Sequence, residues 1–274
     1  MLSHTSISRL APPILGALFL LSASPPLESS ETGVPGGLAY VWWKFDRAEF
    51  EDFQIDITIY NDVAAAPGLY FQMYQGQIGD IGFYFGLQTD LFQTGAGGRG
   101  KGLIFSRWKT RDLSETRPAS DGWAQSAGYE GDFVGVRKRY PWTNHRYRLR
   151  LTAVDEDDQG LWYGLFILDY DNRTEDYAGA IRFPKDAGQR PRIRDGGGTW
   201  MEIYSGAKQP SEVPYWHVSL DRCFADSRKV PARQATADYS KVPNTDIYVA
   251  KETGSIHMLI GKGVSREHQK GKLF

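Results

Sequence analysis

Five arginines at alternate positions make residues 133–152, FVGVRKRYPWTNHRYRLRLT, the stretch with the clearest capacity for chemistry. This segment is predicted to form two strands joined by a turn at 141–144, with Tyr140 paired with His145. Because successive side chains of a strand point to opposite faces, the arginines would share one face of this hairpin. They are Arg137, Arg139, Arg146, Arg148 and Arg150.

A row of guanidinium groups is suited to binding anions. Arginines at every second strand position lie about 6.7 Å apart, and each can hold a carboxylate or sulfate by two hydrogen bonds. The spacing indicates an acidic polysaccharide as the partner, with aromatic rings stacking on its sugars; the candidate rings are Trp142, Trp200 and Tyr204. The alternative is that acids of neighbouring strands pair with the arginines, since like charges facing each other destabilise a sheet.

Three residues are candidates for catalysis if this surface also cleaves its ligand. In a lyase, an arginine would neutralise a uronate carboxylate, and Tyr140 or His145 would remove the adjacent proton. In a glycoside hydrolase, Glu202 of TWMEIYSG would act with a second carboxylate, beside Trp200 and Tyr204 on one strand face. The sequence contains neither the elbow motif of serine hydrolases nor a zinc-ligand spacing.

The acidic turns and the glycine-rich run do not predict a metal or a cofactor. Asp155 begins a pattern like a calcium loop, but the twelfth position of that loop is Phe166 and not glutamate. A structural calcium ion is compatible with such a turn and is not predicted. The run 95–101, GAGGRGK, lacks the Ser or Thr and the following helix of a phosphate-binding loop.

The N-terminus and the charge balance narrow the location and the partners. Residues 1–24 have a basic residue followed by an apolar run too short to span a bilayer, which predicts a secretory signal peptide. The mature chain is therefore expected to be secreted, extracellular or periplasmic, with no membrane insertion. The net charge of the full sequence is −1, which gives no reason to expect nucleic acid. Cys223 is the only cysteine, so no internal disulfide can form.

The distribution of strand-like runs predicts an all-β fold. Apolar residues alternate with polar ones at 53–60, FQIDITIY, and similar short runs recur down the chain between turns. This pattern is typical of a two-sheet sandwich of jelly-roll or concanavalin-like form. The expected organisation is a disordered leader at 25–37 and a single β-sandwich domain at 38–274, with a long loop at 225–244 and a polar tail at 262–272.

Six segments form a recognisable combination: YFGLQTD at 84–90, LIFSRW at 103–108, EGDFVGVRKRYPW at 130–142, YRLRL at 147–151, WYGLFI at 162–167 and TWMEIYSG at 199–206. Together they resemble an exported family known as domain of unknown function 3472. The resemblance covers roughly residues 78–220. It implies a secreted β-rich domain that often accompanies carbohydrate-active modules, and it assigns no catalytic residues.

The sequence thus predicts a secreted protein that binds an acidic polysaccharide through the arginine face. A polysaccharide lyase or glycoside hydrolase on the same surface is one alternative. An extracellular module that binds other proteins is the second.

Overall fold

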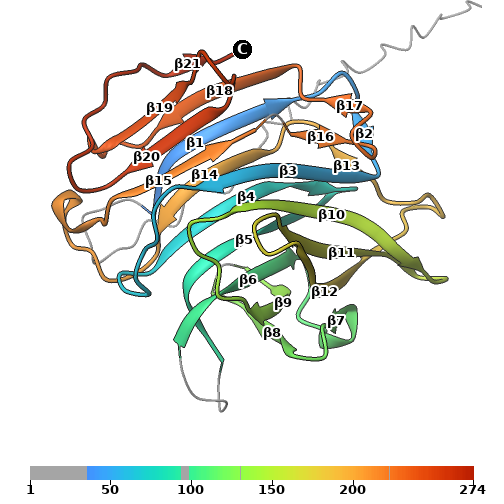
Figure 1. The fold of residues 1–274 in the computed structure, drawn as a ribbon. Coiled ribbons are helices and arrows are strands. Elements are labelled where there is room, and N and C mark those ends of the chain that lie inside the picture. The colour runs from blue at the N-terminus through green and yellow to red at the C-terminus, as the bar shows by residue number, and fades with distance from the viewer. Residues whose placement is uncertain (1–35, 94–98, 130, 222) are drawn as a thin grey trace, which may run out of the picture.

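The computed structural model describes residues 36–93, 99–129, 131–221 and 223–274. These residues form two large antiparallel sheets that pack face to face, so the predicted all-β sandwich is confirmed (Figure 1). Two short 3-10 helices, η1 (Leu113–Glu115) and η2 (Pro210–Glu212), interrupt the strands. Among the described residues, no helix has the length and apolar character needed to cross a membrane.

The larger sheet has eleven strands. They are β1 (Gly37–Lys44), β2 (Glu49–Phe50), β4 (Leu69–Ile78), β5 (Ile81–Phe92), β6 (Arg99–Trp108), β8 (Gly122–Ala127), β9 (Phe133–Arg139), β13 (Ile193–Arg194), β14 (Gly198–Ile203), β18 (Gln234–Tyr239) and β21 (Gly271–Lys272). Their main order is β21-β18-β1-β14-β4-β5-β6-β9-β8, with β2 and β13 off this path.

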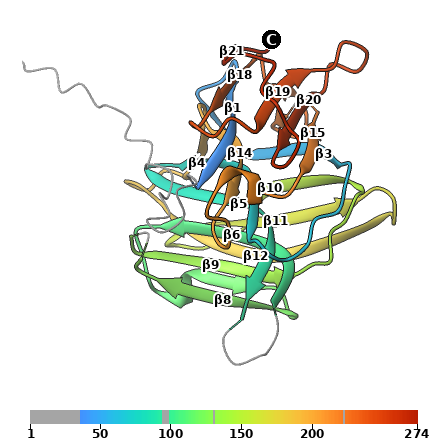
Figure 2. The same cartoon turned by 90° about the vertical axis from the view of Figure 1, so that its left-hand side faces the viewer.

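The smaller sheet has ten strands. They are β3 (Asp52–Ile59), β7 (Thr116–Pro118), β10 (Arg146–Glu156), β11 (Gly160–Asp169), β12 (Thr174–Pro184), β15 (Trp216–Leu220), β16 (Phe224–Ala225), β17 (Val230–Pro231), β19 (Thr245–Val249) and β20 (Ile256–Ile260). Their main order is β19-β20-β15-β3-β10-β11-β12-β7. In Figure 2, β8 and β9 lie at the bottom of the molecule and β18 to β21 lie at the top.

The predicted hairpin of residues 133–152 does not form. Strand β9 pairs with β6 and β8 in the larger sheet, whereas β10 pairs with β3 and β11 in the smaller one. Residues 140–145 therefore cross from one sheet to the other. The predicted pairing of Tyr140 with His145 would place the apolar side chains Val136 and Leu149 opposite each other in one ladder. They instead face the common core from different sheets.

Trp142 explains why the connection crosses between the sheets. Its side chain is 1% exposed. The indole stacks on Trp216 of the smaller sheet, with ring centroids 5.6 Å apart and planes 15° apart. Its Nε1 donates a hydrogen bond of 3.2 Å to the carbonyl oxygen of Gln88 in the larger sheet. A hairpin turn at the surface would leave this large apolar ring in water, so burial favours the crossing.

The predicted loop at 225–244 is wrong in its central part. Residues 234–239 form β18, which pairs with β1 and β21. Ala235 and Ala237 point into the core, and such small residues give a weak apolar alternation. The polar tail ends in β21, and the final Phe274 packs with its ring centroid 6.4 Å from that of Trp43.

The predicted signal peptide at 1–24 lies outside the described residues, as does the leader at 25–37 except for its last two residues. The first strand, β1, begins at Gly37.

Replacing Trp142 by alanine should remove the contact that joins both sheets at the crossing. We expect Trp142→Ala to lower the free energy of unfolding by about 3–5 kcal/mol, as for other fully buried large rings. Urea denaturation followed by circular dichroism measures this loss. Phe92→Ala is the control, because Phe92 is 51% exposed and should change stability by under about 0.5 kcal/mol. Equal effects of the two substitutions would contradict the role given to Trp142.

Candidate functional site

The arginine face predicted from the sequence is wrong as a single surface. Arg137 and Arg139 lie on β9 in the larger sheet, and Arg146, Arg148 and Arg150 lie on β10 in the smaller one. In both strands the alternate positions face the core. The two arginine sets therefore lie on the outer faces of opposite sheets. The sequence correctly predicted which side chains of each strand share a face, but β9 and β10 do not pair with each other.

The arginines of β10 are paired with acids of the same chain. Arg148 lies directly opposite Asp56 of β3, and its Nε and Nη2 donate hydrogen bonds of 2.6 and 2.9 Å to the two carboxylate oxygens. This hydrogen bonding, which outweighs burial, raises the pKa of Arg148 above its ordinary value. Arg146 lies 2.7 Å from an oxygen of Asp221. Arg150 lies 3.3 Å from Glu175, so the alternative considered from the sequence describes this strand.

The arginines of β9 are used to bond the backbone. Arg137 is 4% exposed and donates hydrogen bonds of 3.2 and 3.1 Å to the carbonyl oxygens of Phe105 and Val136. Its side chain lies across Gly135, where a Cβ would come within 2.3 Å of its Nη1. Arg139 donates a hydrogen bond of 2.9 Å to the carbonyl oxygen of Gly100. These contacts hold both guanidinium groups close to the sheet.

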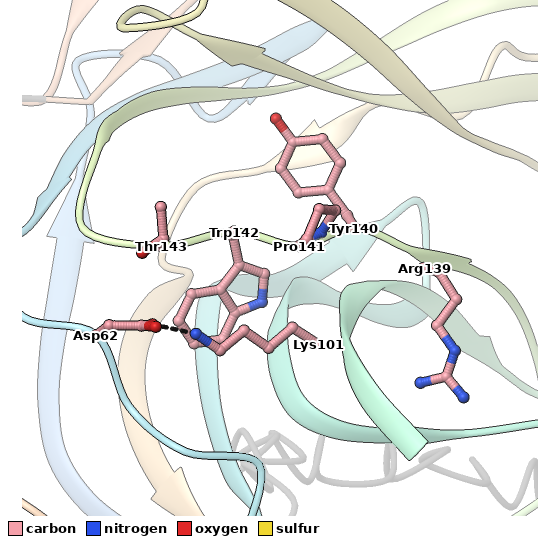
Figure 3. Close-up of a pocket in the computed structure, with 7 residues that line it drawn as sticks. All are labelled: Asp62, Lys101, Arg139, Tyr140, Pro141, Trp142 and Thr143. Carbon is pink, nitrogen blue, oxygen red and sulfur yellow. Dashed lines mark hydrogen bonds and ion pairs between the residues drawn. The ribbon is translucent and has the colours of Figure 1, made fainter. Parts of the chain in front are cut away.

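An open pocket of about 390 Å³ lies beside the crossing segment (Figure 3). Its lining includes three of the predicted site residues, Arg139, Tyr140 and Trp142, although Figure 3 shows the Tyr140 and Trp142 rings on opposite sides of the segment. Lys101 lies over the Trp142 indole, 4.4 Å from a ring centroid, and forms an ion pair with Asp62. The positive charge of Lys101 is therefore already matched within the pocket.

Tyr140 is not a base ready for proton removal. Burial, with a smaller contribution from the negative charge of Asp169, raises the pKa of Tyr140 above its ordinary value, so the phenol keeps its proton at neutral pH. The Nδ1 of His145 lies 3.0 Å from Asp169 Oδ2. Glu202, the third catalytic candidate, lies on β14 of the larger sheet and not on the crossing segment.

One group of three possible metal ligands occurs among the described residues, formed by His145, Asp169 and Asp171. The Asp169 carboxylate already accepts hydrogen bonds from the backbone N–H groups of Asp171 and Asn172, at 2.9 and 3.1 Å. It also accepts one of 2.8 Å from the Asn172 side chain. These bonds explain the cluster as a network that stabilises the turn between β11 and β12.

A second surface combines three aromatic rings, which we call the aromatic platform: Tyr40 and Trp42 of β1 and Trp200 of β14. The two strands are adjacent, and Tyr40 lies directly opposite Trp200. The Tyr40 and Trp42 rings are 4° from parallel, with centroids 6.3 Å apart. Trp200 lies 5.9 and 6.0 Å from them. All three rings are only half-buried and face away from the core.

A glycine sets the height of the platform. Trp42 lies over the backbone of Gly198 in β14, where a Cβ would come within 2.8 Å of its Cε3. A larger residue at position 198 would lift the indole off the sheet. The absent side chain therefore allows Trp42 to lie against the neighbouring strand.

Polar groups border the platform. Glu202 lies on the same face of β14 as Trp200, as predicted, and its Oε2 accepts a hydrogen bond of 3.3 Å from the Trp200 indole. Burial, followed by the charge of Glu202, raises the pKa of Tyr40 above its ordinary value, which places the carboxylate within electrostatic range of that ring. On the other side of Trp200, Gln72 of β4 lies directly opposite it and hydrogen-bonds to Gln75 at 3.1 Å.

Tyr204 is not part of the platform. It follows the end of β14, and its hydroxyl accepts a hydrogen bond of 3.2 Å from the backbone N–H of Asp90. Burial raises the pKa of this tyrosine to about 12.

Sequence reasoning missed Tyr40 and Trp42. Their signal was present, because LAYVWWKF at 38–45 alternates Tyr40, Trp42 and Lys44 with the apolar Val41 and Trp43.

Comparisons with known proteins give limited information. No protein-family model matches the chain, so the resemblance to domain of unknown function 3472 stays a prediction, and no curated protein matches it either. Two solved structures of Scytalido-glutamic peptidase with transition-state analogues are similar to this chain at 10% and 8% identity, with TM-scores of 0.42 and 0.43. A structure of SCP-B, a peptidase of the eqolisin family bound to the tripeptide Ala-Ile-His, is similar at 9% identity and a TM-score of 0.35. Each alignment covers 81% of this chain and 97% of the other. Similarity at this level carries no argument about activity.

The ion pairs of β10 lead to a testable difference between two carboxylates. Asp56→Ala should leave Arg146 and Arg148 without their nearest buried acid and lower the free energy of unfolding by about 2 kcal/mol. Glu175→Ala is the control, since the side chains of Glu175 and Arg150 are 51% and 34% exposed and such pairs contribute under about 1 kcal/mol. Urea denaturation at neutral pH compares them. If Glu175→Ala costs as much as Asp56→Ala, the structural role assigned to the Asp56 pairs is wrong.

Proposed function

We propose that this protein binds a polysaccharide outside the cytoplasm, with sugar rings stacking on the aromatic platform of Tyr40, Trp42 and Trp200. The observation that carries the proposal is that three half-exposed rings gather within 6.3 Å of one another on two adjacent strands. The C–H faces of a sugar are apolar, so packing them on these rings removes apolar surface of both partners from water. Clustered exposed aromatic rings commonly mark a binding surface.

The polar border of the platform supports a sugar as the ligand. Gln75 is half-buried and offers amide donors and acceptors, whereas Glu202 and Gln72, which are 9% and 3% exposed, hold the Trp200 indole and the Gln75 amide in place. These three side chains lie around Trp200, where the edge of a stacked sugar ring would present its hydroxyl groups. A mainly aromatic surface with a few oriented polar groups is the usual composition of a small-molecule or glycan site.

An acidic preference is a separate part of the proposal, because the arginines that first indicated it are bonded within the chain. The Arg139 guanidinium beside the pocket of Figure 3 bonds a backbone carbonyl group, and as a cation on β9 of the larger sheet it would be the group to meet a uronate or sulfate. Export is supported by the signal-peptide pattern at 1–24.

The enzyme alternatives receive no specific support from the geometry. A lyase needs its base beside the bound sugar, whereas Tyr140 and His145 lie at the crossing segment and Glu202 lies beside the platform. We therefore propose binding and not cleavage.

Removing the rings should abolish binding. We expect Trp42→Ala and Trp200→Ala each to weaken retention by about tenfold, since a stacked ring contributes about 1–1.5 kcal/mol, and the double variant to show no retention. Affinity electrophoresis in gels containing neutral, uronate-rich or sulfated polysaccharides measures this. Arg139→Gln should weaken only the binding of the anionic polysaccharides.

Tyr215→Ala is the matched control, because Tyr215 is a 42% exposed ring that precedes β15 of the other sheet. The Tyr215→Ala variant should migrate like the wild type in every gel. Retention unchanged in the double tryptophan variant, or no retention of the wild type by any polysaccharide, would overturn the proposal. New reducing ends released by the wild type but not by Glu202→Gln would assign hydrolysis to the same face.

A further inference from the structure

The outer face of the smaller sheet carries a pair of histidines that the proposed function does not use. His217 of β15 and His257 of β20 are diagonal neighbours, since His257 lies directly opposite Ser219. The Nε2 of His217 and the Nδ1 of His257 are 2.8 Å apart. Both rings are half-buried, and the core-facing positions of the two strands are apolar.

Tyrosine rings hold the pair on both sides. Tyr60 stacks on His217, with centroids 4.2 Å and planes 16° apart. Tyr248 stacks on His257, with centroids 5.0 Å and planes 7° apart. The Tyr60 hydroxyl lies 3.2 Å from the Oγ of Ser219, which fixes the position of that ring. These contacts keep the two facing nitrogens next to each other.

The two imidazoles are neutral ligands at neutral pH. Burial, followed by the charge of His257, lowers the pKa of His217 to about 4, and burial also lowers the pKa of His257. Among the residues described, no carboxylate hydrogen-bonds to either imidazole. A histidine–carboxylate pair is formed by His268 and Asp246, 2.9 Å apart, and it lies on the other side of Tyr248. Each ring thus has a lone pair to offer a metal without first losing a net proton.

We propose that His217 and His257 form a binding site for a divalent copper or nickel ion. Two nitrogens bound at right angles, each about 2.0 Å from the metal, are about 2.8 Å apart. Tetrahedral zinc would need the same nitrogens about 3.3 Å apart. The observed separation belongs to the hydrogen bond that joins the rings in the metal-free chain, and it is closer to the spacing of adjacent positions in the square-planar or tetragonal geometry that Cu²⁺ and Ni²⁺ prefer.

Metal entry requires a change of tautomer and a turn of the rings. The proton that now joins the two rings moves to the other nitrogen of its own ring through solvent, so no net proton is released. Both lone pairs then point to a common position on the outer side. Water completes the coordination there, since Tyr60 beside the pair is 48% exposed.

Copper titration of the untagged full chain tests this site. We expect one Cu²⁺ to bind per chain at this site, with an electron paramagnetic resonance spectrum that shows hyperfine coupling to two imidazole nitrogens. His217→Gln and His257→Gln should each weaken this binding by at least tenfold in competition with a chelator, and the double variant should bind copper no more tightly than either single variant. Zn²⁺ should bind more weakly than Cu²⁺, as the nitrogen separation and the ordinary order of metal affinities both require.

His268→Gln is the control, because it removes an imidazole 5.3 Å from Tyr248 without touching the pair, and copper binding should stay unchanged. Circular dichroism of each metal-free variant verifies its fold. The electron paramagnetic resonance spectrum of the copper-bound wild type tests the site without any variant. A spectrum without two-nitrogen coupling, equal copper affinity in all variants, or tighter binding of Zn²⁺ than of Cu²⁺ would overturn the proposal. None of these outcomes bears on the aromatic platform, which lies on the other sheet.

Discussion

The burial of the Trp142 indole between the two sheets determines how the centre of the chain is arranged. The ring stacks on Trp216 and donates a hydrogen bond to the backbone of Gln88, so it contacts both sheets at once. A chain that buries this ring at the end of β9 must continue into the opposite sheet. Strands β9 and β10 therefore supply apolar side chains to the same core from two sides.

This crossing also determines the electrostatics. Strand β10 lies between β3 and β11, and its arginines are balanced by Asp56 of β3 and by Glu175 of β12. The arginines of β9 bond backbone carbonyl groups of the larger sheet. A buried or half-buried guanidinium without such partners would be costly. These cations thus stabilise the sandwich, and the proposed binding of a sugar rests on the aromatic platform.

The platform and the histidine pair follow the same structural rule on opposite faces. In each, two adjacent strands place side chains of the outer face next to each other, and the inner positions of those strands are packed in the core. The strands that meet are far apart in sequence: β1 and β14 are separated by more than 150 residues. A rigid sheet keeps such groups in place better than a loop would, which suits recognition of a flat ring or of a metal ion.

Side-chain alternation along each strand was determined by the sequence alone, because the period of two follows from backbone geometry. It predicted the all-β sandwich, the shared face of Trp200 and Glu202, and the separation of arginines from apolar residues on β9 and β10. Alternation does not identify the neighbouring strand, because a hairpin and two strands facing each other across a core bury the same residues. Only the tertiary structure decided that β9 and β10 separate, that Tyr40 and Trp42 join Trp200, and that His217 meets His257. Those contacts depend on packing between distant segments, whose energy no local pattern contains.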